Sequence, residues 1–173
     1  MTTSQQPQYV RDLMTPMPIS VSSNTPVHEA HALMQQHRIR HLPVLDHERL
    51  VGMVSDRDIR LVLPSPATSL SVYEIGYLLV HLTVAEIMHR FPITIVPDRP
   101  VTEAVRHMLA HQVGALPVVA GWKVVGIVTR SNLLQAFLLS QGELPAVARA
   151  TPGAETWAWG SLAKRERENG KET

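Results

Sequence analysis

The 173-residue chain contains no cysteine, which excludes disulfide frameworks, thiolate zinc sites and a cysteine nucleophile. It also has little excess charge, because 16 Lys and Arg face 15 Asp and Glu. Neither a basic nucleic-acid-binding surface nor an acidic disordered chain is indicated. Residues 1–8 lack the basic and apolar regions of a signal peptide, and no apolar run approaches the roughly 18 residues that span a bilayer. We therefore expect a cytoplasmic protein without nucleic-acid or membrane partners.

An internal repeat organises the chain. Residues 10–60 align without a gap on residues 84–134, with 16 identities in 51 pairs. The clearest matches are Leu42-Pro43-Val44 with Leu116-Pro117-Val118 and Val51-Gly52 with Val125-Gly126. Self-similarity at this level predicts two copies of one structural unit.

Within each copy, the residue pattern predicts strand, helix, strand, strand, helix. Short β-branched runs at 19–21 and 93–96 indicate strands, and helices are expected to start with Pro26 and Pro100 at the first helical position. Apolar runs predict buried strands over 42–45 and 116–119, then strands over 50–54 and 124–128. Ser55 and Thr129 suit the N-caps of the closing helices.

A copy of about 50 residues buries too little surface to be stable alone. We therefore expect an α/β fold in which two β-α-β-β-α repeats pack sheet to sheet with pseudo-twofold symmetry. The expected organisation is a polar arm (1–9), the first repeat (10–63), a linker (64–83) with an amphipathic helix over 69–82, the second repeat (84–141) and a polar tail (142–173). The tail carries Trp157 and Trp159, whose role the sequence does not reveal.

The repeat resembles the cystathionine β-synthase (CBS) domain, present as the tandem pair called a Bateman module. The residues that carry the likeness are Asp12-Leu13-Met14-Thr15 and Glu86-Ile87-Met88, Arg40-His41-Leu42-Pro43-Val44 and Gly114-Ala115-Leu116-Pro117-Val118, and Gly52 to Asp58 and Gly126 to Asn132. Residues 63–70 look like the stand-alone subgroup named for acetoin utilisation, although no ACT-like domain follows. The resemblance implies a regulatory, non-catalytic module that binds an adenine nucleotide (AMP, ADP or ATP) or another adenosyl ligand in clefts between its halves.

Ser55 and Asp58 are the first candidate ligand residues. A carboxylate at this position would accept hydrogen bonds from both ribose hydroxyls, while the hydroxyl and the free N–H groups of the helix start would face a phosphate. The alternative is that Ser55 is only an N-cap and Asp58 only a favourable first-turn acid. In the second copy Thr129 keeps the hydroxyl, but Asn132 replaces the acid and lacks its charge. We expect unequal sites, the one served by Asp58 being tighter, unless Asn132 is merely an exposed helix residue.

The resemblance assigns further residues to the clefts. They precede the buried strands, namely Ile39, Arg40 and His41 in the first copy and Val113, Gly114 and Ala115 in the second, together with Ser20 and Thr94. Because only the first copy offers cations here, phosphate recognition should also be unequal. The alternative is that Arg40 and His41 are ordinary surface cations, as Arg57 and Arg130 are on the simplest interpretation.

Neither a metal site nor an enzyme is indicated. His107 and His111 share a helix face, but the residue after His107 is Met108, where a zinc protease has glutamate. The chain has no phosphate-binding glycine loop and no nucleophile elbow. The leading hypothesis is therefore a homodimeric sensor of an adenosyl ligand, with or without Mg²⁺, that signals to a regulated protein the sequence does not identify. The competing hypothesis is a ligand-free homodimeric scaffold.

Overall fold

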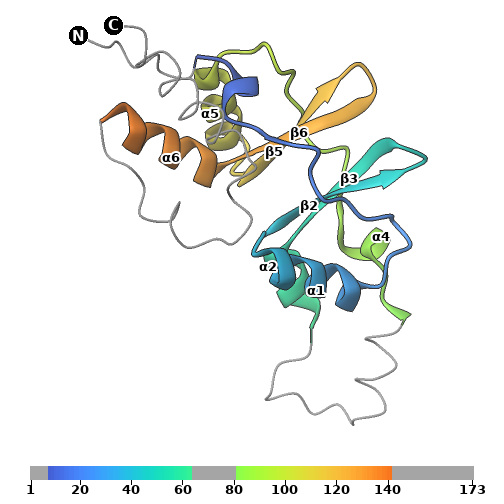
Figure 1. Ribbon diagram of the computed structural model, residues 1–173. Helices are drawn as coiled ribbons and strands as arrows, with labels where there is room; N and C mark the ends of the chain where they lie inside the picture. The colour runs from blue at the N-terminus through green and yellow to red at the C-terminus, as the bar shows by residue number, and fades with distance from the viewer. Residues whose placement is uncertain (1–7, 64–80, 142–173) are drawn as a thin grey trace, which may run out of the picture. The chain divides into compact units, whose positions relative to one another are not determined.

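The computed structural model describes residues 8–63 and 81–141. These residues form a mixed α/β fold with two three-stranded sheets, which confirms the predicted fold class (Figure 1). Residues 69–80 of the expected linker helix, and the tail with Trp157 and Trp159, lie outside the described residues.

The first repeat supplies a helix, a hairpin and a second helix. These are α1 (Val27–His37), β2 (His41–Asp46), β3 (Arg49–Ser55) and α2 (Asp56–Val62). Helix α1 ends where Arg38 adopts the left-handed conformation and its N–H donates to the carbonyl groups of Gln35 and Met34, a common way to terminate a helix. Both strands carry apolar runs that are buried at their centres, as expected of strands that face a core.

The second repeat has the same order of elements. These are α5 (Val101–Ala110), β5 (Ala115–Ala120), β6 (Lys123–Thr129) and α6 (Arg130–Ser140). The turn between β5 and β6 places Gly121 at a φ of 63°, a conformation that glycine adopts without steric cost.

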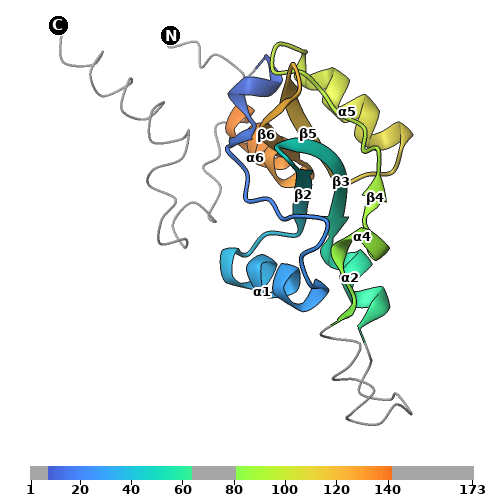
Figure 2. The ribbon, with the colours of Figure 1, turned by 90° about the vertical axis from the view of Figure 1, so that its right-hand side faces the viewer.

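The segment that leads into each repeat joins the sheet of the other repeat. Lead-in η1 (Val10–Asp12) and β1 (Thr15–Pro16) open the first repeat, yet β1 pairs with β6 in the order β1-β6-β5. Lead-in α4 (Val84–Ile87) and β4 (His89–Arg90) open the second repeat, yet β4 pairs with β3 in the order β2-β3-β4. Figure 2 shows β4 running alongside β3. Each sheet is therefore completed by chain from outside its own repeat.

Because of this exchange, each of the two compact units into which the described residues divide combines parts of both repeats. One compact unit draws on the chain up to Pro16, on Ile95–Val118 and on the chain from Gly126. The other draws on Met17–Thr94 and Val119–Val125. In the second of these units, a buried apolar cluster joins α1, β2, β3, α2 and α4 through Met34, Leu42, Val54, Ile59 and Val84.

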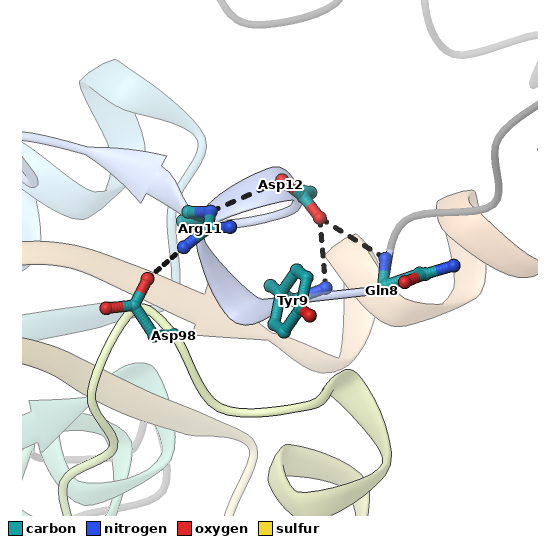
Figure 3. A network of polar contacts seen from close by, with 5 residues as sticks. All are labelled: Gln8, Tyr9, Arg11, Asp12 and Asp98. Carbon is teal, nitrogen blue, oxygen red and sulfur yellow. Dashed lines mark hydrogen bonds and ion pairs between the residues drawn. The ribbon is translucent and has the colours of Figure 1, made fainter.

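Polar contacts fix the first lead-in to the loop before α5 (Figure 3). Asp12 accepts hydrogen bonds from the N–H groups of Gln8 (3.2 Å) and Tyr9 (2.9 Å), which closes the turn. Arg11 pairs with Asp98 and also lies 4.6 Å from the centre of the Tyr9 ring. The backbone N–H of Val10 donates to the carbonyl of Arg99 at 2.9 Å. Backbone and side-chain contacts thus hold the same two segments together.

Two details of the sequence prediction differ from the structure. The strands expected over 19–21 and 93–96 are reduced to isolated parallel bridges, Val21 with Val44 and Ile95 with Val118. Pro26 and Pro100, expected at the first helical position, are N-caps with extended backbone, so each helix begins one residue later, at Val27 and Val101. Adjacent prolines and turns leave each segment only one ladder position, since proline cannot donate to a strand.

Candidate ligand-binding site

Ser55 and Asp58 are joined by reciprocal hydrogen bonds at the junction of β3 and α2. Oδ2 of Asp58 accepts from the Ser55 N–H (2.8 Å) and from the Ser55 hydroxyl (2.6 Å). In return, the Asp58 N–H lies 3.4 Å from the Ser55 hydroxyl oxygen. This is a capping box with an acid at the third helical position. The two residues predicted from their spacing are therefore brought together, and they also stabilise the helix start.

Thr129 and Asn132 repeat this arrangement where β6 meets α6. Oδ1 of Asn132 accepts from the Thr129 N–H (2.8 Å) and hydroxyl (2.6 Å). The alternative that Asn132 is merely an exposed helix residue is wrong, because its partly buried amide caps the helix. An amide oxygen replaces a carboxylate oxygen with the same geometry, so the two junctions differ mainly in charge. We call them the Asp58 corner (Ser55, Asp58) and the Asn132 corner (Thr129, Asn132).

The residues before each hairpin adjoin these corners through the backbone. The Asp56 N–H donates to the carbonyl of Arg40 (2.9 Å), and the Arg130 N–H donates to the carbonyl of Gly114 (3.0 Å). His41 opposes Ser55 across the β2–β3 ladder. The Arg40 side chain is exposed. Arg40 and His41 thus lie beside the Asp58 corner, whereas the Asn132 corner has Gly114 and Ala115 there.

The remaining predicted residues are Ile39 and Val113, and Ser20 and Thr94. Ile39 and Val113 close the turns after α1 and α5, with their N–H groups donating to the carbonyls of Met34 (2.9 Å) and Met108 (3.1 Å). Ser20 and Thr94 directly precede the bridge residues Val21 and Ile95. Their backbone therefore runs beside the middle of β2 and of β5.

Sequence reasoning missed a further side chain at the Asp58 corner, His89 on β4. Its Nε2 lies 3.1 Å from Oδ1 of Asp58. The two residues are 31 positions apart, and they meet because β4 pairs with β3 so that His89 opposes Met53. The only signal in the sequence was that a histidine follows the repeated methionine, where the first copy has Thr15.

The neighbouring acid, Asp56, contacts basic side chains of α1 and α2 instead. Its Oδ2 lies 2.9 Å from Nε of Arg60, and its Oδ1 lies 3.8 Å from Nε2 of His31. Arg57 and Arg130 are exposed. The pairing of Asp56 with α1 and α2 gives it a structural role distinct from that of Asp58.

The histidines and helices were also compared with metal-binding and membrane-spanning patterns over the described ranges 8–63 and 81–141. Within them, no group of three or more His, Asp or Glu residues is arranged to hold a metal ion. His107 and His111 instead stack, with ring centres 6.1 Å apart. No helix in this part of the chain has the length and apolar character to cross a membrane.

Two curated relatives show how far the likeness extends. A CBS domain-containing protein of Dictyostelium discoideum is 33% identical over 132 residues, which cover 75% of this chain and 90% of that protein. The L-aspartate semialdehyde sulfurtransferase of Methanocaldococcus jannaschii is 32% identical over 130 residues, which cover 74% of this chain but only 23% of the enzyme. The likeness to that enzyme is therefore confined to a minor part of it.

Several solved structures share the fold. The CBS domain pair of MJ0100, in complex with 5′-methylthioadenosine and S-adenosylmethionine, is 30% identical with a TM-score of 0.63, covering 76% of this chain and 97% of that one. CBSX2 in complex with AMP is 31% identical with a TM-score of 0.63, covering 78% and 99%. AcuB of Vibrio cholerae, named for acetoin utilization, is 28% identical with a TM-score of 0.63, covering 83% and 98%.

The family assignment rests on both repeats. The CBS domain family matches residues 10–65 and again residues 84–139, which together make up more than half of the chain. These ranges contain both corners and both hairpins described above. The chain therefore belongs to the CBS domain family and carries a tandem pair of these domains.

Proposed function

We propose that this protein is a cytoplasmic regulatory module that binds an adenine nucleotide or a related adenosyl ligand and passes the signal to a partner protein. The observation that carries the proposal is the Asp58 corner, where a largely buried carboxylate is held in place by Ser55. Similar CBS pairs bind AMP, 5′-methylthioadenosine or S-adenosylmethionine, which supports this ligand class.

The chemistry of the corner suits a ribose. An ionised carboxylate only accepts hydrogen bonds, and a ribose offers two neighbouring hydroxyl donors. Hydrogen bonds to a charged group contribute about 1.5–3 kcal/mol each. Asn132 presents an amide, which both donates and accepts, so the Asn132 corner should bind the same diol more weakly. Arg40 and His41 beside the Asp58 corner add cations for a phosphate.

The test is titration calorimetry with AMP, ADP, ATP, S-adenosylmethionine and 5′-methylthioadenosine, with and without Mg²⁺. Asp58→Asn is the informative variant, because Asn132 demonstrates that an amide preserves the capping geometry. We expect at least one of these ligands to bind the wild type and its affinity to fall about 10- to 100-fold in Asp58→Asn. Asn132→Asp is the matched control and should strengthen the other site. Unchanged affinity in Asp58→Asn would remove Asp58 from the ligand site.

A ligand-free homodimeric scaffold is the second candidate function. It is favoured by large apolar side chains exposed on the closing helices, namely Leu61 (75% exposed) on α2 and Leu134 (65%) and Phe137 (61%) on α6. Large exposed apolar side chains on helices commonly mark protein interfaces. The ligand sensor is proposed to be a homodimer as well. Analytical ultracentrifugation should show a dimer in either case, so the calorimetric titration decides between the two functions.

A further inference from the structure

The Asp58 carboxylate is held from two sides, and the outer side is occupied by His89. Ser55 donates two hydrogen bonds to Oδ2 of Asp58, and the imidazole Nε2 of His89 lies 3.1 Å from Oδ1. The Asp58 side chain is only 14% exposed, whereas His89 is 76% exposed. His89 therefore stands between the carboxylate and the solvent, where an approaching ligand would meet it.

The equivalent position at the other corner is uncharged. In the repeat alignment His89 corresponds to Thr15, and the strand register is the same, since His89 opposes Met53 and Thr15 opposes Ile127. The acid that His89 contacts corresponds to Asn132. An imidazole–carboxylate pair at one corner thus corresponds to a hydroxyl and an amide at the other, and neither of these ionises at neutral pH.

We infer that His89 is a specificity-determining residue that makes the Asp58 corner select phosphorylated adenosyl ligands over uncharged ones. This inference rests on the proposed function and names the ligand class of that same site. A carboxylate alone repels a phosphate, while a cation paired with it cancels that repulsion. At this short range near a protein surface, one charge changes the affinity for an anion by about three- to tenfold once solvent screening is included.

The ratio of the affinities for AMP and adenosine isolates the effect of His89 on phosphate binding. His89 occupies Oδ1 of Asp58, so it also competes with a ribose for that oxygen. The competition acts equally on adenosine and AMP, because both present the same ribose diol. The ratio of the adenosine dissociation constant to the AMP dissociation constant therefore reports only the interaction with the phosphate.

The charge of the imidazole, when it is protonated, acts among other charged groups. The charged groups on the elements packed against β4 are Arg49 on β3, Asp56, Arg57, Asp58 and Arg60 on α2, Glu86 on α4 and Arg90 on β4 itself. Among these, Asp58 is the group in contact with the His89 ring.

The experiment measures adenosine and AMP binding by calorimetry to the full chain and its variants at about pH 6. The binding site whose affinity falls in Asp58→Asn is identified as the Asp58 corner. His89→Gln replaces the imidazole with an uncharged side chain of similar length. The control variant His47→Gln removes a different exposed histidine, which lies in the turn between β2 and β3. Thr15→His introduces the imidazole at the Asn132 corner.

We expect the AMP preference at the Asp58 corner to fall about three- to tenfold in His89→Gln at pH 6 and to stay unchanged in His47→Gln. Thr15→His should raise the AMP preference at the Asn132 corner. An unchanged ratio in His89→Gln, with both ligands still bound, would overturn the role of His89 and leave the proposed function standing. If the wild type binds none of the adenosyl ligands, the proposed function is overturned and the role of His89 with it.

Discussion

The sulfur of Met14 occupies the space that a side chain on Gly126 would need, since a Cβ there would lie 2.5 Å from Met14 Sδ. The same relationship recurs between Met88 and Gly52, where a Cβ would again lie 2.5 Å from Sδ. In each case the methionine comes from a lead-in segment and the glycine from the sheet that this segment completes. The absence of a side chain at Gly52 and Gly126 is therefore what lets the lead-ins approach.

Gly126→Ala should lower the free energy of unfolding by about 1–3 kcal/mol, because an extra methyl group in a packed contact forces its neighbours to move. Urea unfolding followed by circular dichroism measures this loss. In the double variant with Met14→Ala the glycine substitution should cost less than it does alone, since the clashing sulfur is gone and contacting residues are not additive. Equal costs in both backgrounds would contradict the contact.

Asp58→Ala should lower the free energy of unfolding by about 1 kcal/mol, as the loss of a helix cap does. Asp58→Asn should cost less than half of that, because the amide oxygen of Asn132 already performs this role at the other corner. Thermal or urea unfolding of the two variants provides the comparison. Equal destabilisation by alanine and asparagine would show that the carboxylate charge, and not the accepted hydrogen bonds, stabilises the helix start.

The β2–β3 turn is a site for stabilisation. His47 and Glu48 have φ values of 48° and 64°, a pair that favours Asn-Gly in two-residue hairpins. The double substitution His47→Asn and Glu48→Gly should raise the free energy of unfolding by about 0.5–1 kcal/mol, since left-handed backbone is unfavourable for other residues. Urea unfolding measures the change, and loss of stability would contradict the expected turn geometry.

Asp46 gives the stability of the protein a defined pH dependence. Hydrogen bonds from the side chain and the backbone N–H of Ser23 lower the pKa of the Asp46 carboxyl below its ordinary value. A carboxyl whose pKa is lower in the folded state stabilises the fold above its unfolded pKa of about 3.9. That contribution is lost as the pH falls through the lower, folded value.

The comparison is between the wild type and Asp46→Asn, with unfolding free energies measured across the acid range. The stability advantage of the wild type should be present at neutral pH and should disappear in acid. In Ser23→Ala, NMR titration should show the Asp46 pKa moving up toward its ordinary value. A carboxyl that titrates identically in Ser23→Ala would remove Ser23 as the cause.

Much of the architecture was predictable because it depends on local patterns and on the repeat. The hairpin strands, the helices that follow Pro26 and Pro100, and the N-cap at Ser55 were found from apolar periodicity and capping chemistry. Those signals act between residues close in sequence. The pairing of Ser55 with Asp58 was predictable for the same reason, since three positions separate them.

The residue pattern alone establishes the duplicated α/β unit and the two corners, because propensity, periodicity and capping are properties of neighbouring residues. That each lead-in completes the sheet of the other repeat becomes evident only in the folded chain. That exchange depends on the fit of Met14 on Gly126 and of Met88 on Gly52, between residues that are distant in the chain. It also brings His89 to Asp58, because a strand of two residues gains its partners from packing and not from its own sequence.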